Sequence, residues 1–200
     1  MIKKTIIDPF SKDSISILSN SLSKALLPVI KSGKNIVFLC IGTDRSTGDC
    51  LGPLVGQKLE LLIHNNICLF GTLEKPVHAK NLNSVIDEIN VSFNNPFIVA
   101  IDACLGSIQN VGKIVIDGKP ICPGSAVNKN LPQVGNISIT GIVNISGGME
   151  FMILQNTRLY TVMLLAEIIS RGIYQYIIDT FGTDKDCVNS ENITQKSQVI

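Results

Sequence analysis

Three short apolar runs stand out in the first half of the chain. Residues 36–41 and 96–101 are almost continuously apolar and lack the alternation of a half-exposed strand, and residues 67–70 form a shorter run of the same kind. Uninterrupted apolar runs of this length are typical of parallel strands that are covered on both faces. These segments therefore predict three buried, parallel strands.

The segments beside these strands carry apolar side chains at helical spacing instead. Strand and helix then alternate from residue 35 to residue 102, an order that predicts right-handed crossovers between parallel strands. The predicted fold is an α/β three-layer sandwich with a mostly parallel central sheet. The predicted helices cover residues 14–32, 51–63 and 81–93.

The second half of the chain is less regular. Residues 112–116, followed by Asp117-Gly118, resemble one arm of a hairpin, and residues 137–145 are strand-like. A helix is predicted over residues 158–171, capped by Asn156 or Thr157 and stopped by Gly172.

Composition narrows the class of protein. The 200 residues are 45% hydrophobic and 16% charged, and the formal net charge is +1. These values predict one α/β domain over residues 1–180, with its core in residues 35–172 and a polar, frayed tail over residues 181–200. The balanced charge favours neither nucleic acid nor an anionic membrane as a partner.

The location is predicted from what the chain lacks. Asp8 and Pro9 interrupt the start of the chain before an apolar stretch of signal length forms, and no apolar run approaches the ~18 residues that cross a bilayer. The six cysteines form no CxxC pair, which favours reduced thiols in a reducing compartment. A cytoplasmic protein is expected.

Two polar segments follow buried strands, at the edge of the sheet where open parallel sheets bind ligands. Residues 42–53 follow the first strand and contain Asp49, and residues 102–107 follow the third and begin with Asp102. A carboxylate beside an apolar strand is disfavoured as a charge unless it is paired or functional. The alternative for Asp102 is that it caps a turn. Asp49 is expected to be the N-cap of the helix from Leu51, a role that does not exclude chemistry.

If Asp49 and Asp102 converge, their like charges interact and the pair shares one proton. Such a pair can hold a water between a base and an acid for hydrolysis, or it can bind a divalent cation. The loop after the first strand lacks the Gly-Lys-Ser/Thr and GxGxxG patterns of phosphate-binding loops, so nucleotide binding is disfavoured.

Further residues are candidates for supporting the site or binding substrate. Asp44 is an alternative acid in the first loop, or an Asx-turn residue, and Arg45 can bind a substrate carboxylate or remain solvated. His78 lies between a strand and a helix at the same edge, where it can shuttle protons or bond the backbone. Ser125 and Lys129 weakly suggest a serine–lysine dyad in a loop rich in glycine and proline.

Catalysis by cysteine is disfavoured. Cys50 and Cys104 directly follow the two aspartates, and adjacent carboxylates raise the pKa of a thiol rather than activate it.

A family resemblance rests on six motifs in a fixed order. Together they resemble the YyaC sporulation proteins over residues 35–172. The motifs are CIGTDRSTGDCLGP (40–53), GTLEKPVHAKNL (71–82), IDACLG (101–106), PGSAV (123–127), ITGIVN (139–144) and LQNTRL (154–159).

The resemblance extends to the spore germination protease and, more distantly, to the endopeptidases that mature nickel-iron hydrogenases. It implies a phosphorylase/hydrolase-like sandwich in which Asp49 and Asp102 match the two essential aspartates of the germination protease. In the hydrogenase endopeptidases the corresponding acids resemble nickel ligands, helped by a later histidine. The only histidines here, His64 and His78, both precede Asp102, so a nickel-sensing role is not expected.

The function expected from the residues and the resemblance is peptide-bond hydrolysis by a paired-aspartate site in sporulation. The expected substrate is a peptide or a small spore protein, and no cofactor is expected, although a divalent metal at Asp49 and Asp102 is the metal-dependent option. The alternative is a catalytically degenerate module that binds a peptide without cleaving it. The protein is also a candidate homo-oligomer.

Overall fold

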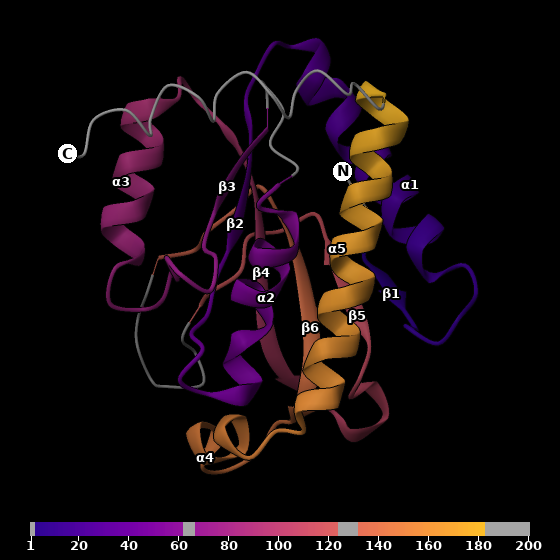
Figure 1. Cartoon of the computed structure of the whole chain (residues 1–200), viewed down its shortest axis with the longest axis vertical. Helices are drawn as coiled ribbons and strands as arrows, with labels where there is room; N and C mark the ends of the chain where they lie inside the picture. The colour runs from indigo at the N-terminus through magenta and orange to yellow at the C-terminus, as the bar shows by residue number, and fades with distance from the viewer. Residues whose placement is uncertain (1–2, 62–66, 124–131, 183–200) are drawn as a thin grey trace, which may run out of the picture.

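In the computed structural model, which describes residues 3–61, 67–123 and 132–182, a six-stranded sheet has helices on both faces (Figure 1). The strand order is β1-β5-β6-β4-β2-β3. The neighbours in the run β6-β4-β2-β3 are parallel, whereas β5 pairs antiparallel with β6 and with β1. The bounds are β1 Thr5–Ile7, β2 Ile36–Cys40, β3 Ile67–Phe70, β4 Phe97–Gly106, β5 Ile114–Asp117 and β6 Ile137–Ile145.

The three-layer prediction is confirmed by two separate apolar cores. Helices α1 (Ser14–Lys31), α2 (Leu51–Leu59) and α5 (Leu159–Phe181) pack with one face of the sheet, and α3 (Leu82–Ser92) packs with the other. Alternate residues of β2 enter the two cores in turn, and every one of them is buried. This double burial explains why the strand sequence is apolar without interruption.

The predicted end of the last helix is wrong. The helix α5 continues through Gly172 to Phe181, because a glycine within a helix is tolerated when it serves packing. A Cβ at Gly172 would lie 2.6 Å from the Leu18 Cδ2 atom, so the missing side chain lets α1 approach α5 closely. The predicted tail after Gly182 lies outside the described residues.

The predicted cap of the same helix is also wrong. The N-cap of α5 is Arg158, and it makes no side-chain capping hydrogen bond. The Thr157 hydroxyl instead donates to the Ile153 carbonyl at 2.8 Å, at the end of the unpredicted helix α4 (Glu150–Gln155).

Other boundaries differ from the predictions by smaller amounts. The helix predicted to reach residue 63 ends as α2 at Leu59, and the edge strand β1 was not predicted. The predicted hairpin arm is the strand β5. It pairs antiparallel with β6, but residues 118–136 lie between the two strands in the sequence. Two short 3-10 helices, η1 (Thr47–Cys50) and η2 (Ile108–Asn110), complete the described elements.

The helix α5 is long and apolar enough to span a membrane when judged by length and composition alone. However, 56% of its most apolar window is buried within the protein, where α5 packs beside α1 (Figure 1). Its apolar character is therefore that of a core helix.

Candidate active site

Asp102 lies within β4 and not at its end, which corrects the prediction. The strand continues to Gly106 because β6 keeps pairing with it, and Asp102 itself is opposite Thr140. On the other side, β2 pairs with β4 only as far as Cys40 and Ile101. Asp102 is therefore the residue at which β4 loses one neighbour and keeps the other.

The sheet opens beside Asp102 because the chain leaves β2 at Gly42. The Ile41 amide donates to the Ile101 carbonyl at 2.7 Å, and the next amide, of Gly42, donates instead to Val77. The chain from β2 goes to β3 on one side, whereas β4 continues toward β5 and β6 on the other. This divergence of neighbouring connections is the place where open α/β sheets bind ligands.

Asp49 reaches the same opening from η1. Its backbone is fixed because its amide donates to the Ser46 carbonyl and its carbonyl accepts from the Thr43 amide, both at 3.0 Å. Gly42, at φ +142°, makes this approach possible, since a Cβ there would lie 2.0 Å from the Asp49 carbonyl oxygen. The glycine is needed because a side chain would occupy the space that the η1 backbone fills.

The prediction that Asp49 caps the following helix is wrong. The 3-10 helix η1 leads directly into α2, whose N-cap is Cys50, and no side-chain capping hydrogen bond is formed. The carboxylate of Asp49 is therefore not used by the helix and lines a pocket with Asp102.

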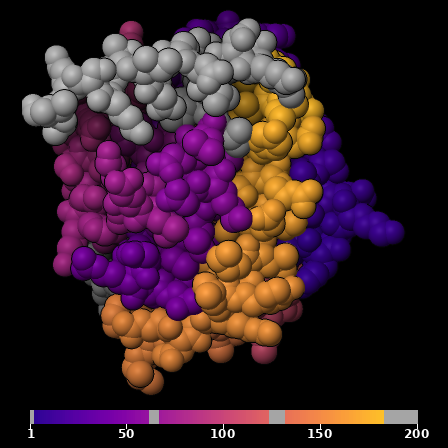
Figure 2. Space-filling view, viewed as in Figure 1, coloured from indigo at the N-terminus to yellow at the C-terminus, as the bar shows by residue number. Residues whose placement is uncertain are grey.

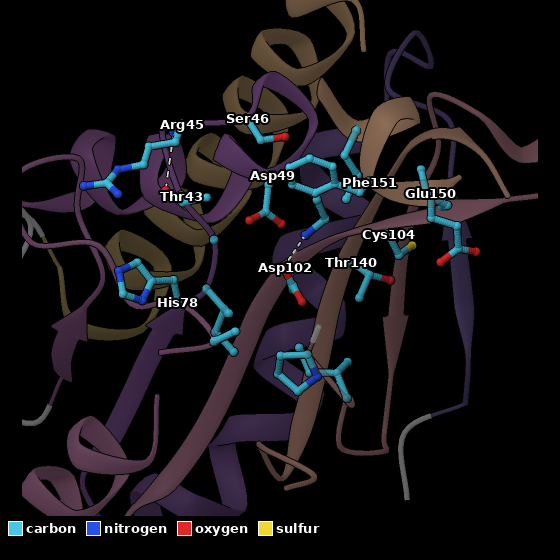
Figure 3. Close-up of a pocket in the computed structure, with 18 of the residues that line it drawn as sticks. Thr43, Arg45, Ser46, Asp49, His78, Asp102, Cys104, Thr140, Glu150 and Phe151 are labelled. Atoms are coloured by element: carbon cyan, nitrogen blue, oxygen red, sulfur yellow. Dashed lines mark hydrogen bonds between the residues drawn. The ribbon is translucent and has the colours of Figure 1, made fainter. Parts of the chain in front are cut away.

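The pocket that the two aspartates share has a volume of about 730 Å³. Its walls come from β4, β6, η1 and α4 and from three connecting segments, after β2, before α3 and after β5. Figure 3 shows Asp49 and Asp102 in the middle of this pocket, with His78 on one side and Cys104 and Glu150 on the other. The volume is in the range of sites that bind small molecules.

Burial disfavours the charged form of both carboxylates. It raises the pKa of Asp49 from 3.8 to about 6, although a hydrogen bond from the Thr43 backbone opposes the rise. The pKa of Asp102 is raised well above its ordinary value, first by burial and then by the charge of Asp49, against a 2.8 Å hydrogen bond from the Ala103 amide. The pair therefore holds a proton at pH values where isolated aspartates do not.

A family model described as a protein of unknown function, DUF1256, matches residues 10–172. The chain belongs to the DUF1256 family. It is 49% identical over 163 residues to the uncharacterized protein YyaC of Bacillus subtilis strain 168. The matched residues cover 82% of this chain and 77% of that protein. The resemblance to the YyaC proteins is confirmed.

A solved structure is also similar to the DUF1256 chain. It is the [NiFe] hydrogenase maturation protease HycI from Thermococcus kodakarensis KOD1, at 20% identity and a TM-score of 0.39. The similarity covers 72% of this chain and 98% of that one. At this level the similarity does not bear on the chemistry of the DUF1256 site.

The structure brings some of the predicted supporting residues of the DUF1256 site together and leaves others out. Arg45 and His78 line the pocket with the aspartates, although Arg45 is exposed and its guanidinium extends away from them in Figure 3. Asp44 is exposed and does not line the pocket. Ser125 lies outside the described residues.

The main chain of His78 is held by hydrogen bonds at the start of α3. Its amide donates to the Asn81 side-chain oxygen at 2.8 Å, and this contact fixes the start of α3. The Nδ1 atom of His78 is buried and has no hydrogen-bond partner among the described residues.

The five described cysteines of the DUF1256 chain are free, and those beside the aspartates are poor nucleophiles. Burial raises the pKa of Cys104 to about 11, and the charge of Asp102 adds to the effect. Burial also raises the pKa of Cys50. Both side chains are therefore neutral thiols at pH 7.

Sequence reasoning missed the pocket residues that come from unpredicted elements. Phe151 and Leu154 enter the pocket from α4, and Ser46 lies just before η1. Thr140 was detectable, since it belongs to a predicted strand, but its place opposite Asp102 depends on the register between β4 and β6. No pattern in the sequence specified that register.

Proposed function

We propose that the chain is an aspartate-dependent endopeptidase in which Asp49 and Asp102 hydrolyse a peptide bond. The observation that carries the proposal is that both carboxyl groups line one pocket and both have raised pKa values, one more strongly than the other. Two acids whose surroundings give them different pKa values are suited to act as a base and an acid at the same pH.

The roles follow from the order of the two pKa values. With a pKa of about 6, Asp49 is largely ionised at pH 7 and accepts a proton from water, whose oxygen attacks the peptide carbonyl carbon. Asp102, the more deeply buried acid, keeps its proton and donates it to the leaving nitrogen as the C–N bond breaks. The proton on Asp49 then returns to Asp102, which restores the starting state.

We propose further that the reaction needs no resident metal ion. The described residues contain no group of three or more His, Cys, Asp or Glu side chains arranged to hold a metal. Two carboxylates supply fewer oxygen ligands than the six to eight that a calcium ion takes. Activity that survives exhaustive chelation would support this part of the proposal, and activity restored only by added metal would contradict it.

The biological setting is part of the same proposal. The resemblance to the YyaC sporulation proteins favours a peptide or small spore protein as substrate, in the cytoplasm of the forespore or mother cell. The net charge of +1 gives no support to a nucleic-acid or membrane partner. A homo-oligomer is compatible with this setting.

One observation favours a second candidate function, a module that binds a peptide without cleaving it. Among the described residues, no other side chain donates a hydrogen bond to the carboxylate of Asp49 or Asp102. A catalytic pair is normally oriented by such contacts. Tight binding of a peptide that is never turned over would favour this second function.

The deciding experiment compares the wild-type protein with the Asp102→Asn variant. Each is incubated with an extract of sporulating cells, and new peptide termini are identified by mass spectrometry. We expect termini that appear only with the wild-type protein. Identical sets of termini from the two proteins would rule out hydrolysis by this pair.

A further inference from the structure

The helix α4 lines the pocket with two polar side chains, Glu150 and Gln155, and with two apolar side chains that the aspartate chemistry does not use. Phe151 and Leu154 line the pocket from α4, and Leu105 and Ile121 contribute apolar surface from β4 and from the segment after β5. Leu154 is buried, whereas 53% of Phe151 is exposed. Figure 3 shows Phe151 beside Asp49, so its free aromatic surface lies next to the proposed reacting groups.

The helix that carries Phe151, α4, packs closely against η1, the element that carries Asp49. Gly48 of η1 lies so close to α4 that a Cβ there would be 2.8 Å from the Leu154 carbonyl oxygen. At the same end of α4, the Asn144 side chain donates to the Thr157 hydroxyl at 3.2 Å and to the Ile153 carbonyl at 3.4 Å. Figure 2 shows the orange surface of this region against the purple surface that includes η1.

We infer that Phe151 determines specificity by packing against a large apolar side chain of the substrate, next to the bond that is cleaved. The inference deepens the proposed function and rests on Asp49 and Asp102 being the reacting pair. An apolar substrate side chain removes its own surface and that of Phe151 from water, which favours binding. An aromatic side chain adds the preference of two rings for stacked or edge-to-face contact.

The chain supplies a matched control in the neighbouring residue. Met152 lies on the same helix and is also 53% exposed, but it does not line the pocket. Removing either side chain changes a similar amount of apolar surface on α4. Only the change at Phe151 alters the wall that faces the aspartates.

The first experiment measures binding without turnover. The chain contains no tryptophan, so a peptide Ac-Ala-Ala-Trp-Ala-Ala-amide reports its own binding by fluorescence. The protein carries Asp102→Asn to block cleavage, and Ac-Ala-Ala-Ala-Ala-Ala-amide serves as a competitor. We expect the Ala peptide to bind about tenfold more weakly, as for the loss of a large group from an apolar pocket.

Substitutions at Phe151 and Met152 then test whether Phe151 makes the contact with the peptide. Phe151→Ala should weaken binding of the Trp peptide about tenfold, Phe151→Leu should restore most of it, and Met152→Ala should change it less than twofold. Thermal unfolding of each variant shows whether the fold is retained. Equal losses in Phe151→Ala and Met152→Ala, or no loss in either, would overturn the inference.

The second experiment separates this inference from the proposed function. Wild-type protein and its Phe151→Ala variant are incubated with a random peptide library, and the new termini are sequenced. Binding that prefers Trp, without any cleavage, supports the apolar subsite and rejects hydrolysis. Cleavage without preference for a large apolar residue rejects the subsite and supports hydrolysis, and the absence of both binding and cleavage overturns both.

Discussion

The two aspartates of the pocket are the same chemical group in two different settings. Asp102 belongs to the long central strand β4, is 9% exposed and is fixed by pairing with β6. Asp49 belongs to a short 3-10 helix and is partly exposed, and its position depends on the close contact with Gly42. The difference in burial separates their pKa values, and this is how two identical side chains acquire different proton states.

The largest expected effect comes from removing either acid. Asp49→Asn and Asp102→Asn should each lower kcat by about 100- to 10,000-fold, because each removes one proton transfer of the pair. The double variant should lose little more than either single variant, since the two groups act as a unit. Peptide cleavage under single-turnover conditions measures all three. Independent, additive losses would show that the acids do not work together.

The second effect tests how Asp49 is held. Gly42→Ala should destabilise the protein by about 3 kcal/mol, because it forces a Cβ into the backbone of η1 at a positive φ. Gly147→Ala is the matched control, as a Cβ there meets nothing within 4 Å. Urea unfolding compares the two. If Gly42→Ala left the free energy of unfolding unchanged, η1 would be able to move away from β2 at little cost.

The third effect concerns stability. Replacing either aspartate by asparagine should raise the stability of the folded protein at high pH, although it lowers activity. The raised pKa of Asp49 means that the folded state binds its proton more tightly, so stability falls as pH rises from below 4 through about 6. Asp49→Asn should therefore gain stability at pH 8 relative to pH 4, by at most about 3 kcal/mol. Asp102→Asn should gain more, and over a higher pH range, because burial raises the pKa of Asp102 further.

Urea unfolding at pH 4, 6 and 8 checks this sign for both variants. A loss of stability at pH 8 in either variant would show that its carboxylate is stabilised by contacts in the folded protein. The burial argument would then fail for that residue.

The smallest effect is the shape of the pH–rate profile. The value of kcat/KM should rise tenfold per pH unit below about 6, where Asp49 is still protonated, and level off above it. It should fall again at the higher pH where Asp102 loses its proton. A profile that is already flat at pH 5 would remove Asp49 as the base.

The central strands and their crossover helices could be predicted from the sequence because burial on both faces leaves a direct apolar signature, as in β2. The strand β1 could not, since three residues at an edge carry no period. The end of α5 was misjudged at Gly172, where tight packing on Leu18 outweighs the low helix propensity of glycine.

The same division holds for the site. Asp49 and Asp102 were predicted to share a pocket because both follow buried strands, and the structure brings them together. The apolar contribution of α4 was not predicted, because Phe151 belongs to a six-residue helix whose place against η1 is set by tertiary contacts. Asp44 was a candidate by sequence position alone, and the turn of the loop leaves it in solvent.

The lengths of the strands have a consequence for how copies of this protein meet one another. The longest strands, β4 and β6, lie inside the sheet, whereas its two borders are the three-residue β1 and the four-residue β3. An unpaired border strand offers its amide and carbonyl groups to any passing chain, and a short one offers few. The long strands are thus shielded from intermolecular β-pairing, which limits one common route to aggregation.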